Sequence, residues 1–375
     1  MRTLLILFFG LLLLQCSADQ DLEKVLAMEN ASNDLQRGSY DNSGTPLNWP
    51  WRGINITSKD TIGVNENRIK EVKDLGVNTI RIVIDARTFS INYDLDIEEG
   101  IDQNLIWCEN IIKWCAKEGI VVIIESLDYT HNQEKVNITS PEFWESEVAL
   151  NEAINYIEEL VIRLDKYENV VAYDFFSEPT AVSLDGVGVR PPNWYGFFDK
   201  LLQTVRNNSN KYVVFTPGAW GLPNGYHDFK TPIDDEKIIY GFHYYNPHTY
   251  THQGINNWAG IFNYPDVIND KHWNENAIRN DIEYVSKWAK ENDKLLYVGE
   301  FSVVRWAEGK EQYIEDVLNV FEENNISYTY WVLNEWVGWN MDYEPIEKNS
   351  TILNKTPEKT KTRQILENFW SKNNQ

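Results

Sequence analysis

The sequence predicts an α/β fold in which eight parallel strands close into a barrel inside a ring of helices. Three observations lead to this prediction. Short apolar, β-branched segments occur eight times, longer amphipathic segments separate most of them, and glycines stand where a helix would end before a strand. Strands that alternate with helices pair in parallel, and eight of them close a (β/α)8 or TIM barrel. The 375 residues suit a single domain of this kind, which we place at residues 48–375.

The eight strand-like segments are rich in Val, Ile, Tyr and Phe, as strands buried on both faces require. In chain order they are Arg52–Ile56, Thr79–Ile84, Val121–Ser126, Val170–Phe176, Tyr212–Thr216, Ile238–Tyr244, Leu295–Phe301 and Ser327–Val332. The helix-like segments carry apolar residues at helical intervals along one face. They are Glu66–Leu75, Gln103–Glu118, Glu142–Lys166, Trp194–Asn208, Glu275–Asn292, Lys310–Asn324 and Glu358–Lys372. Gly76 and Gly119 follow the first two of them, in the position that a helix C-terminus favours.

Two stretches interrupt the alternation. Residues 217–236 are rich in Gly, Pro and Asp and predict no helix between the fifth and sixth strands. Residues 245–273 predict a long excursion of the loop after the sixth strand.

Two cysteines fall within one predicted helix. Cys108 and Cys115 would stand roughly 10 Å apart along the helix axis. A disulfide needs Cα atoms within about 7 Å. The spacing therefore predicts buried free thiols.

The N-terminus predicts an export signal at residues 1–18. Met1-Arg2 precedes the apolar run Leu4 to Leu14, which is too short for a stable membrane span. Leu13-Leu14-Gln15-Cys16 is similar to a bacterial lipobox, whose cleavage would leave a lipidated Cys16 and a membrane attachment. The small residues Cys16-Ser17-Ala18 would instead suit ordinary signal peptidase and a soluble secreted product. Residues 19–47 are polar and without periodicity, which predicts a tether.

Charge and aromatic content narrow the class of partner. A net charge of −23 repels phosphate backbones, so we expect no nucleic-acid partner. The sequence holds 15 Trp and 20 Tyr, and the flat apolar faces of sugars stack on such rings. Aromatic residues also fill cores, so this content agrees with a carbohydrate ligand without requiring one.

Two carboxylates occupy the positions where barrel enzymes carry catalytic groups, at the C-terminal ends of strands. Glu178 follows the fourth strand in Ser177-Glu178-Pro179, and Glu300 lies near the end of the seventh in Gly299-Glu300-Phe301. Two carboxylates that face one cleft suit glycoside cleavage, since one protonates the departing oxygen while the other attacks or activates water.

These segments resemble glycoside hydrolase family 5, and the resemblance covers most of residues 48–372. Ser177-Glu178-Pro179 looks like its Asn-Glu-Pro signature and Gly299-Glu300-Phe301 like its nucleophile segment. Asn78-Thr79-Ile80-Arg81 is similar to the second-strand motif, and His243-Tyr244-Tyr245 to the His-x-Tyr motif of the sixth strand. Trp331 matches the aromatic floor that closes the eighth strand. The resemblance implies a retaining reaction with Glu178 as general acid/base and Glu300 as nucleophile.

The matched positions imply roles for their side chains. Arg81 is expected to hold Glu300 ionised and oriented, and Tyr245 to donate its hydroxyl to the same carboxylate. His243, Trp331 and Ser177 are expected to contact substrate. Each has a plainer alternative: Glu300 could pair with Arg81 only structurally, Glu178 could cap a helix, and His243, Tyr245 and Trp331 could fill the core.

The sequence departs from the family pattern at two places. Ser177 replaces the Asn whose amide donates to the sugar 2-hydroxyl. The third strand ends in Glu125-Ser126-Leu127-Asp128 without the usual His, for which only His131 offers a loop substitute. We assign no chemistry to Glu125 or Asp128.

Several loop residues have the chemical type of a site residue but lie away from the matched motifs. Asn334-Glu335 imitates the signature but lies in a loop past the eighth strand. His248 and His252 lack a third ligand at a suitable spacing, so we expect polar loop residues there and no metal. No organic cofactor is implied either. One or two of five loop tryptophans are expected to form outer sugar subsites: Trp220, Trp258, Trp306, Trp336 and Trp339.

The sequence therefore predicts an exported, monomeric, retaining hydrolase of polysaccharides, foremost an endo-β-1,4-glucanase of cellulase type. A β-mannanase or an exo-acting β-glycosidase of the same clan is the first alternative. A barrel that binds carbohydrate without cleaving it is the alternative of another class, and Ser177 together with the missing third-strand His motivates it.

Overall fold

The computed structural model describes residues 45–58, 64–126, 137–255, 258, 260–333, 335–336, 338–343 and 359–374. The predicted export signal, most of the predicted tether, His131, Asp128 and Asn334 lie outside these residues. Among the helices of the described part, none combines the length and the hydropathy that a membrane crossing needs.

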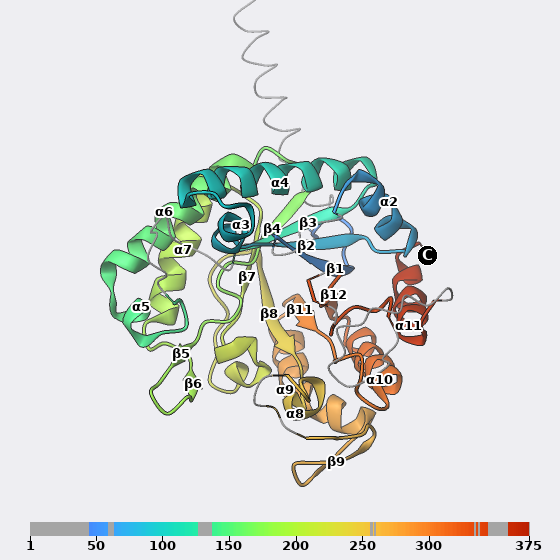
Figure 1. Ribbon diagram of the computed structural model, residues 1–375. Coiled ribbons are helices and arrows are strands. Elements are labelled where there is room, and N and C mark those ends of the chain that lie inside the picture. The colour runs from blue at the N-terminus through green and yellow to red at the C-terminus, as the bar shows by residue number, and fades with distance from the viewer. Residues whose placement is uncertain are drawn as a thin grey trace, which may run out of the picture.

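Eight parallel strands form a closed barrel, which confirms the predicted fold class (Figure 1). Around the barrel the order is β1-β12-β11-β8-β7-β4-β3-β2, so the first strand pairs with the last. Their bounds are β1 (Arg52–Thr57), β2 (Thr79–Ile84), β3 (Val121–Ser126), β4 (Val170–Tyr173), β7 (Tyr212–Phe215), β8 (Ile238–Tyr244), β11 (Leu296–Phe301) and β12 (Ser327–Tyr330). Two short hairpins stand apart from the barrel: β5 (Ala181–Val182) with β6 (Gly188–Val189), and β9 (Asp266–Ile268) with β10 (Lys271–Trp273).

Helices surround the barrel, with α4 and α6 on one side and α9, α10 and α11 on the other (Figure 1). Their bounds are α2 (Glu66–Asp74), α3 (Ala86–Tyr93), α4 (Ile97–Lys117), α5 (Pro141–Glu145), α6 (Glu147–Leu164), α7 (Trp194–Asn208), α8 (His248–Thr251), α9 (Glu275–Glu291), α10 (Lys310–Glu323) and α11 (Lys361–Trp370). The chain ends beside its own first strand, where Asn373 donates to the carbonyls of Arg52 and Gly76.

Helix capping explains where the observed helices differ from the predicted ones. The predicted helix Glu142–Lys166 is two helices, because Ser146 adopts an extended conformation and caps α6 by accepting from the Ala149 N–H. Helix α4 begins earlier than predicted, since Asp96 caps it through the Glu99 N–H. Helix α3 was not predicted, although Asp85 caps it in the same way.

The interruptions of the alternation are as predicted. Between β7 and β8 the chain forms only the 3-10 turns Ala219–Gly221 and Pro223–His227. The excursion after β8 holds α8 and the β9-β10 hairpin. Cys108 and Cys115 are buried free thiols on α4, and burial raises the pKa of each.

Alternation along the strands separates two cores. On β3, Val122 and Ile124 pack under the helices, whereas Val121 and Ile123 join a cluster with Trp51 and Tyr297 inside the barrel. Side chains that continue the inner rows toward the C-terminal ends of the strands therefore meet at the barrel mouth. Glu125 continues the row of Val121 and Ile123 in this way.

Candidate active site

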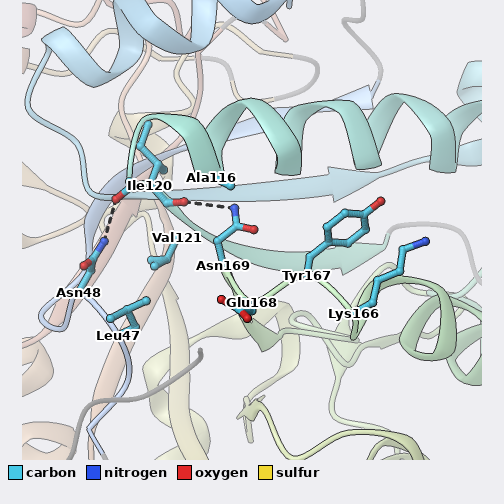
Figure 2. A pocket seen from close by; sticks show the side chains of 10 residues that line it. Leu47, Asn48, Ala116, Ile120, Val121, Lys166, Tyr167, Glu168 and Asn169 are labelled. Carbon is cyan, nitrogen blue, oxygen red and sulfur yellow. Dashed lines mark hydrogen bonds between the residues drawn. The ribbon is translucent and has the colours of Figure 1, made fainter. Parts of the chain in front are cut away.

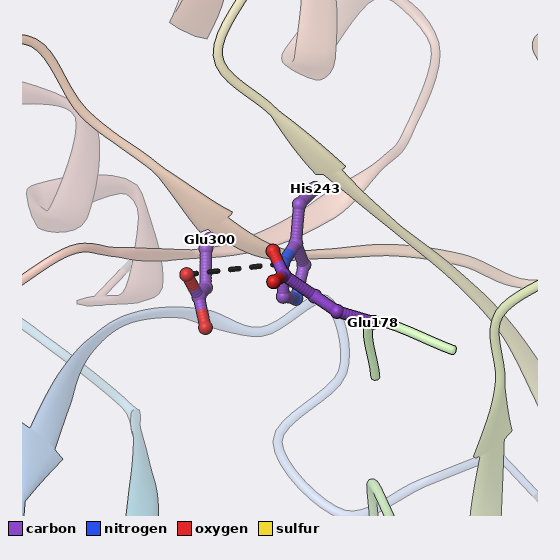
Figure 3. A group of neighbouring side chains, drawn as sticks. All are labelled: Glu178, His243 and Glu300. Carbon is purple, nitrogen blue, oxygen red and sulfur yellow. Dashed lines mark hydrogen bonds and ion pairs between the residues drawn. The ribbon is translucent and has the colours of Figure 1, made fainter. Parts of the chain in front are cut away.

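Glu178 and Glu300 meet at the C-terminal mouth of the barrel, and His243 lies next to both of them (Figure 3). His243 Nδ1 lies 2.9 Å from Glu178 Oε1 and 3.7 Å from Glu300 Oε2. One polar atom from each of the three side chains lies within 4.8 Å of the others. Residues that are remote in the sequence thus share one small space.

A local irregularity of β11 turns Glu300 toward this space. Strict alternation would place Glu300 on the same face as Val298, which packs in the outer core. The pairing register of β11 with β8 shifts between Val298 and Glu300, and such a bulge re-aims a side chain. Asn55 and Thr329 fix the bulge by donating to the carbonyl of Gly299, at 3.0 and 2.6 Å.

Arg81 is the cation at the centre of the site. It is fully buried, and it lies 3.1 Å from Glu300, 2.8 Å from Asp174 and 2.7 Å from Glu125. Burial alone would lower the pKa of Arg81, but Glu125, Asp174 and Glu300 outweigh it and raise that pKa well above its usual value. Arg81 therefore stays charged and holds Glu300 in a fixed orientation.

Tyr245 is the second partner of Glu300. Its hydroxyl donates to Glu300 Oε2 at 3.0 Å, on the opposite oxygen from Arg81. Burial, then the charges of Glu300 and Glu178, raise the pKa of Tyr245 well above its usual value, so the phenol keeps its proton and remains a donor. The two oxygens of Glu300 are thus held separately, by a cation and by a hydroxyl.

His243 carries a proton more readily than an ordinary histidine. Burial opposes its charge, but Glu300 and Glu178 outweigh burial and raise the pKa of His243 to about 8. At neutral pH His243 is therefore largely protonated, in contact with Glu178 and close to Glu300.

Ser177, the residue before Glu178, is hydrogen-bonded to Glu125. Its hydroxyl makes a short hydrogen bond to Glu125 Oε1, and both side chains are buried. Sequence reasoning assigned no chemistry to Glu125 and overlooked Asp174 and Asn55. The alternation of inward residues on β1, β3 and β4 was the signal that could have found them.

The carboxylates open onto a small cavity of about 230 Å³. It is lined by Glu125, Ser126, Ile138, Thr139, Trp144, Phe176, Ser177, Glu178, Glu300 and Trp331. Trp331 directly follows β12 and is 8% exposed. The cavity combines flat aromatic walls with a few polar groups, which is the usual composition of a site for a small polar ligand.

Aromatic rings extend from the cavity along the loops. Measured between ring centroids, Trp339 lies 6.2 Å from Tyr245, and Trp336 lies 5.7 Å from Trp339. Trp306 continues the row at 5.6 Å from Trp336. Trp258 is connected to Trp339 through the stacked rings of His248 and His252. Trp220 and Trp258 are 39% and 43% exposed.

His252 packs behind the site, with its ring centroid 5.0 Å from that of Tyr245, and His248 stacks on it. Their rings stack at 3.7 Å, and burial lowers the pKa of His248 to about 4 and that of His252 to about 3. Within the described residues, the one group of three side chains with metal-ligand spacing is Glu178, His243 and Glu300.

A larger cavity, of about 590 Å³, lies at the opposite end of the barrel (Figure 2). It is bounded by Val121 at the start of β3, by Asn169 before β4 and by Asn48, which donates to the Gly119 carbonyl at 3.0 Å. Of the described residues that line this cavity, Glu168 is the only carboxylate. Because barrel enzymes carry their chemistry at the other end, size alone does not identify the site here.

Comparison with known proteins identifies the family. The model for cellulase (glycosyl hydrolase family 5) matches residues 40–336, so the chain belongs to glycosyl hydrolase family 5. Among curated proteins it is similar to Endoglucanase 3 of Fibrobacter succinogenes, with 20% identity over 331 residues. That match covers 77% of this chain and 48% of the Fibrobacter protein, so the chain matches about half of that relative. Cellodextrinase A of Ruminococcus flavefaciens is 23% identical over 290 residues, covering 73% of this chain and 79% of that protein.

Solved structures show the same fold. Cel5A of Thermotoga maritima in complex with cellobiose has a TM-score of 0.63 and 20% identity, covering 84% of this chain and 97% of that one. The same enzyme in complex with mannotriose has a TM-score of 0.63 and 19% identity, covering 85% and 98%.

Proposed function

We propose that this protein is a retaining glycoside hydrolase that cleaves β-1,4-glucan chains internally, as a cellulase-type endoglucanase. One observation carries the proposal: Glu178 and Glu300 line the same cavity as Trp331, and a carboxylate oxygen of one lies within 4.8 Å of a carboxylate oxygen of the other. Retaining enzymes hold their carboxyl groups about 5–5.5 Å apart, whereas inverting enzymes leave a wider gap for water. The curated relatives named endoglucanase and cellodextrinase support the substrate class.

The reaction follows from the contacts of the two carboxylates. Glu300, fixed by Arg81 and Tyr245, attacks the anomeric carbon while Glu178 gives its proton to the departing oxygen. Glu178 then removes a proton from water, which displaces Glu300 and releases the sugar with retained configuration. His243 touches both carboxylates and orients Glu178 for these two transfers.

Replacing the proposed nucleophile tests this mechanism. Glu300→Ala is expected to lower kcat on 2,4-dinitrophenyl β-cellobioside by roughly 10⁴-fold or more, because no covalent intermediate can form. Added azide is expected to restore turnover and to give the α-glycosyl azide, identified by NMR. Glu308→Ala, which removes an exposed acid on the loop after β11, serves as the control and should keep full activity. Full activity of Glu300→Ala would refute the assignment of the nucleophile.

A β-mannanase and an exo-acting enzyme remain as second functions. The mannotriose complex of Thermotoga maritima Cel5A favours the first, and the α8 and β9-β10 excursion beside the mouth favours the second. Assays on neutral β-glucans, mannans and xylans with product analysis separate them, since a ladder of oligomers indicates endo action and one small product indicates exo action. Binding without cleavage of any of these glycans would instead support the non-catalytic carbohydrate-binding barrel.

We also propose that the protein is exported and acts as a monomer on polysaccharide. The apolar run Leu4 to Leu14 supports export, and Cys16 would carry the lipid if the lipobox is used. The mass of the mature N-terminal peptide distinguishes a diacylated Cys16 from cleavage after Ala18.

A further inference from the structure

We propose that Glu125 and Ser177 form a hydroxyl relay, in which Glu125 sets through Ser177 how the enzyme binds the sugar hydroxyl next to the cleaved bond. This inference rests on the proposed glycosidase function. It assigns a positioning role to Glu125 and substrate contact to Ser177.

The two side chains are joined and both reach the cavity. The Ser177 hydroxyl is bonded to Glu125 Oε1, and both residues line the same small cavity as Glu178 and Glu300. Ser177 precedes Glu178 in the chain, and Glu125 is held by the same Arg81 that holds Glu300. The pair therefore lies beside the carbon that Glu300 would attack, within reach of the hydroxyl on the neighbouring carbon.

The two places where the sequence departs from the family pattern are also in contact with each other. Ser177 stands where the pattern has Asn, and Glu125 lies at the end of the strand that lacks the usual His. An Asn amide donates a hydrogen bond whatever its neighbours do. A serine has one hydrogen to donate, so its role toward the sugar depends on where that hydrogen points.

A proton on Glu125 decides the direction of that hydrogen. When Glu125 is ionised it can only accept, so Ser177 donates to it and offers the sugar lone pairs alone. When Glu125 is protonated on Oε1, its own O–H can donate to Ser177 Oγ. The serine hydrogen is then free to donate to the sugar hydroxyl, as the replaced Asn amide would.

Burial together with two neighbouring carboxylates favours the protonated state of Glu125. Burial is the largest cause, and Asp174 and Glu300 add to it, while Arg81 and the Ser177 hydroxyl oppose it. The phenol of Tyr297 also lies close enough to interact. Together they raise the pKa of Glu125 to about 8. At neutral pH most molecules therefore carry the proton that the relay needs.

A purely structural ion pair with Arg81 fits the contacts less well. Arg81 already has well-aligned hydrogen bonds to Asp174, Asn55 and Glu300. Its Nη2 lies 2.7 Å from Glu125 Oε2, yet neither atom has a partner in hydrogen-bond geometry among the described residues. The aligned bond of Glu125 is the one to Ser177, which faces the cavity.

A comparison of two substrates isolates the relay from the rest of catalysis. The probes are 2,4-dinitrophenyl β-cellobioside and its analogue without the 2-hydroxyl on the ring that carries the dinitrophenolate. Glu300 attacks both probes and Glu178 lies beside the same departing dinitrophenolate in both. Titration of those two groups therefore cancels in the ratio of kcat/KM on the 2-hydroxy probe to kcat/KM on the 2-deoxy probe. In the wild type, this preference for the 2-hydroxy probe is expected to fall about tenfold as pH rises through about 8, where Glu125 loses its proton. Tenfold is the effect of one lost hydrogen bond.

Two variants and one control complete the test. Glu125→Gln can donate permanently to Ser177 and should keep the ratio high and independent of pH. Ser177→Ala should lower kcat/KM about tenfold on the 2-hydroxy substrate and less than about twofold on the 2-deoxy substrate. Glu109→Gln, the same change at a buried acid on α4, should leave the pH dependence of the ratio as in the wild type.

The outcomes separate the relay from the proposed function. Equal losses on both substrates in Ser177→Ala, or a wild-type ratio that does not change with pH, would overturn the relay while the enzyme remains a glycosidase. Failure of the wild type to cleave either substrate would overturn the proposed function and the relay with it. Infrared spectra give a readout that needs no turnover: a protonated-carboxyl band that disappears near pH 8 and is absent in Glu125→Gln supports the relay, and its absence at pH 6 refutes it.

Discussion

His243 shows how much a single residue depends on its neighbours. The sequence places a histidine at the end of the sixth strand, but its protonation state is set by Glu178 in the loop after β4 and by Glu300 in β11. A histidine with an ordinary pKa of about 6.5 would be largely neutral at pH 7.5. Here the two carboxylates keep it largely charged.

This raised pKa predicts a specific dependence of stability on pH. The folded protein binds the His243 proton more tightly than the unfolded chain, so the stabilisation is complete below about pH 6.5 and is lost as pH rises through about 8. The loss amounts to at most about 2 kcal/mol. Urea unfolding between pH 6 and 9 should show this decline in the wild type and a smaller one in His243→Gln. His227→Gln, at an exposed histidine stacked on Tyr284, should decline like the wild type; a decline of equal size in His243→Gln would contradict the prediction.

At the scale of the elements, the bulge in β11 is the feature that strand prediction could not supply. The sequence predicts a strand ending at Phe301, and it does. Alternation alone would then turn Glu300 outward, under the helices. The rule that strand ends converge at the barrel mouth predicted a cleft-facing Glu300, and the register shift against β8 turns the side chain that way.

Gly299 allows the bulge to approach β8 closely, which predicts the effect of a single methyl group. A Cβ at Gly299 would lie 2.8 Å from His243 Nε2 and 3.4 Å from Asp174 Oδ2. Gly299→Ala should therefore displace His243 and lower kcat at least about tenfold, since misplaced catalytic groups lose rate steeply, while circular dichroism still shows a folded barrel.

Gly196→Ala is the matched control for that change. Gly196 lies in α7 with no atom within 4 Å of an added Cβ. Its replacement should leave kcat unchanged and stabilise the protein by about 0.5–1 kcal/mol, since alanine favours a helix. Equal kcat values for Gly299→Ala and the wild type would show that His243 tolerates the displacement.

At the scale of the whole molecule, the net charge of −23 acts on every approaching substrate. Its field repels anionic polymers over roughly 30 Å at 10 mM salt and over about 8 Å at physiological ionic strength. A neutral β-glucan carries no charge, so this field does not repel it.

The charge thus predicts a salt effect that depends on the substrate. On carboxymethylcellulose, KM should fall roughly two- to fivefold between 10 and 200 mM NaCl, because salt screens the repulsion. On neutral barley β-glucan, KM should change less than about twofold. Initial rates by reducing-sugar assay at both salt concentrations check this, and the same salt effect on both polymers would exclude repulsion as its cause.

The sequence by itself determined the alternation of strands and helices, the closed barrel and the positions of Glu178 and Glu300. These follow from local periodicity and from the rule that strand ends converge at one mouth. The tertiary structure decided which side chains touch: the shared hold of Arg81 on Glu125, Asp174 and Glu300, the bond between Ser177 and Glu125, and the protonation of His243. Such contacts join strands far apart in the chain, and their energies depend on burial and on distances of a few ångströms, which no local pattern of residues encodes.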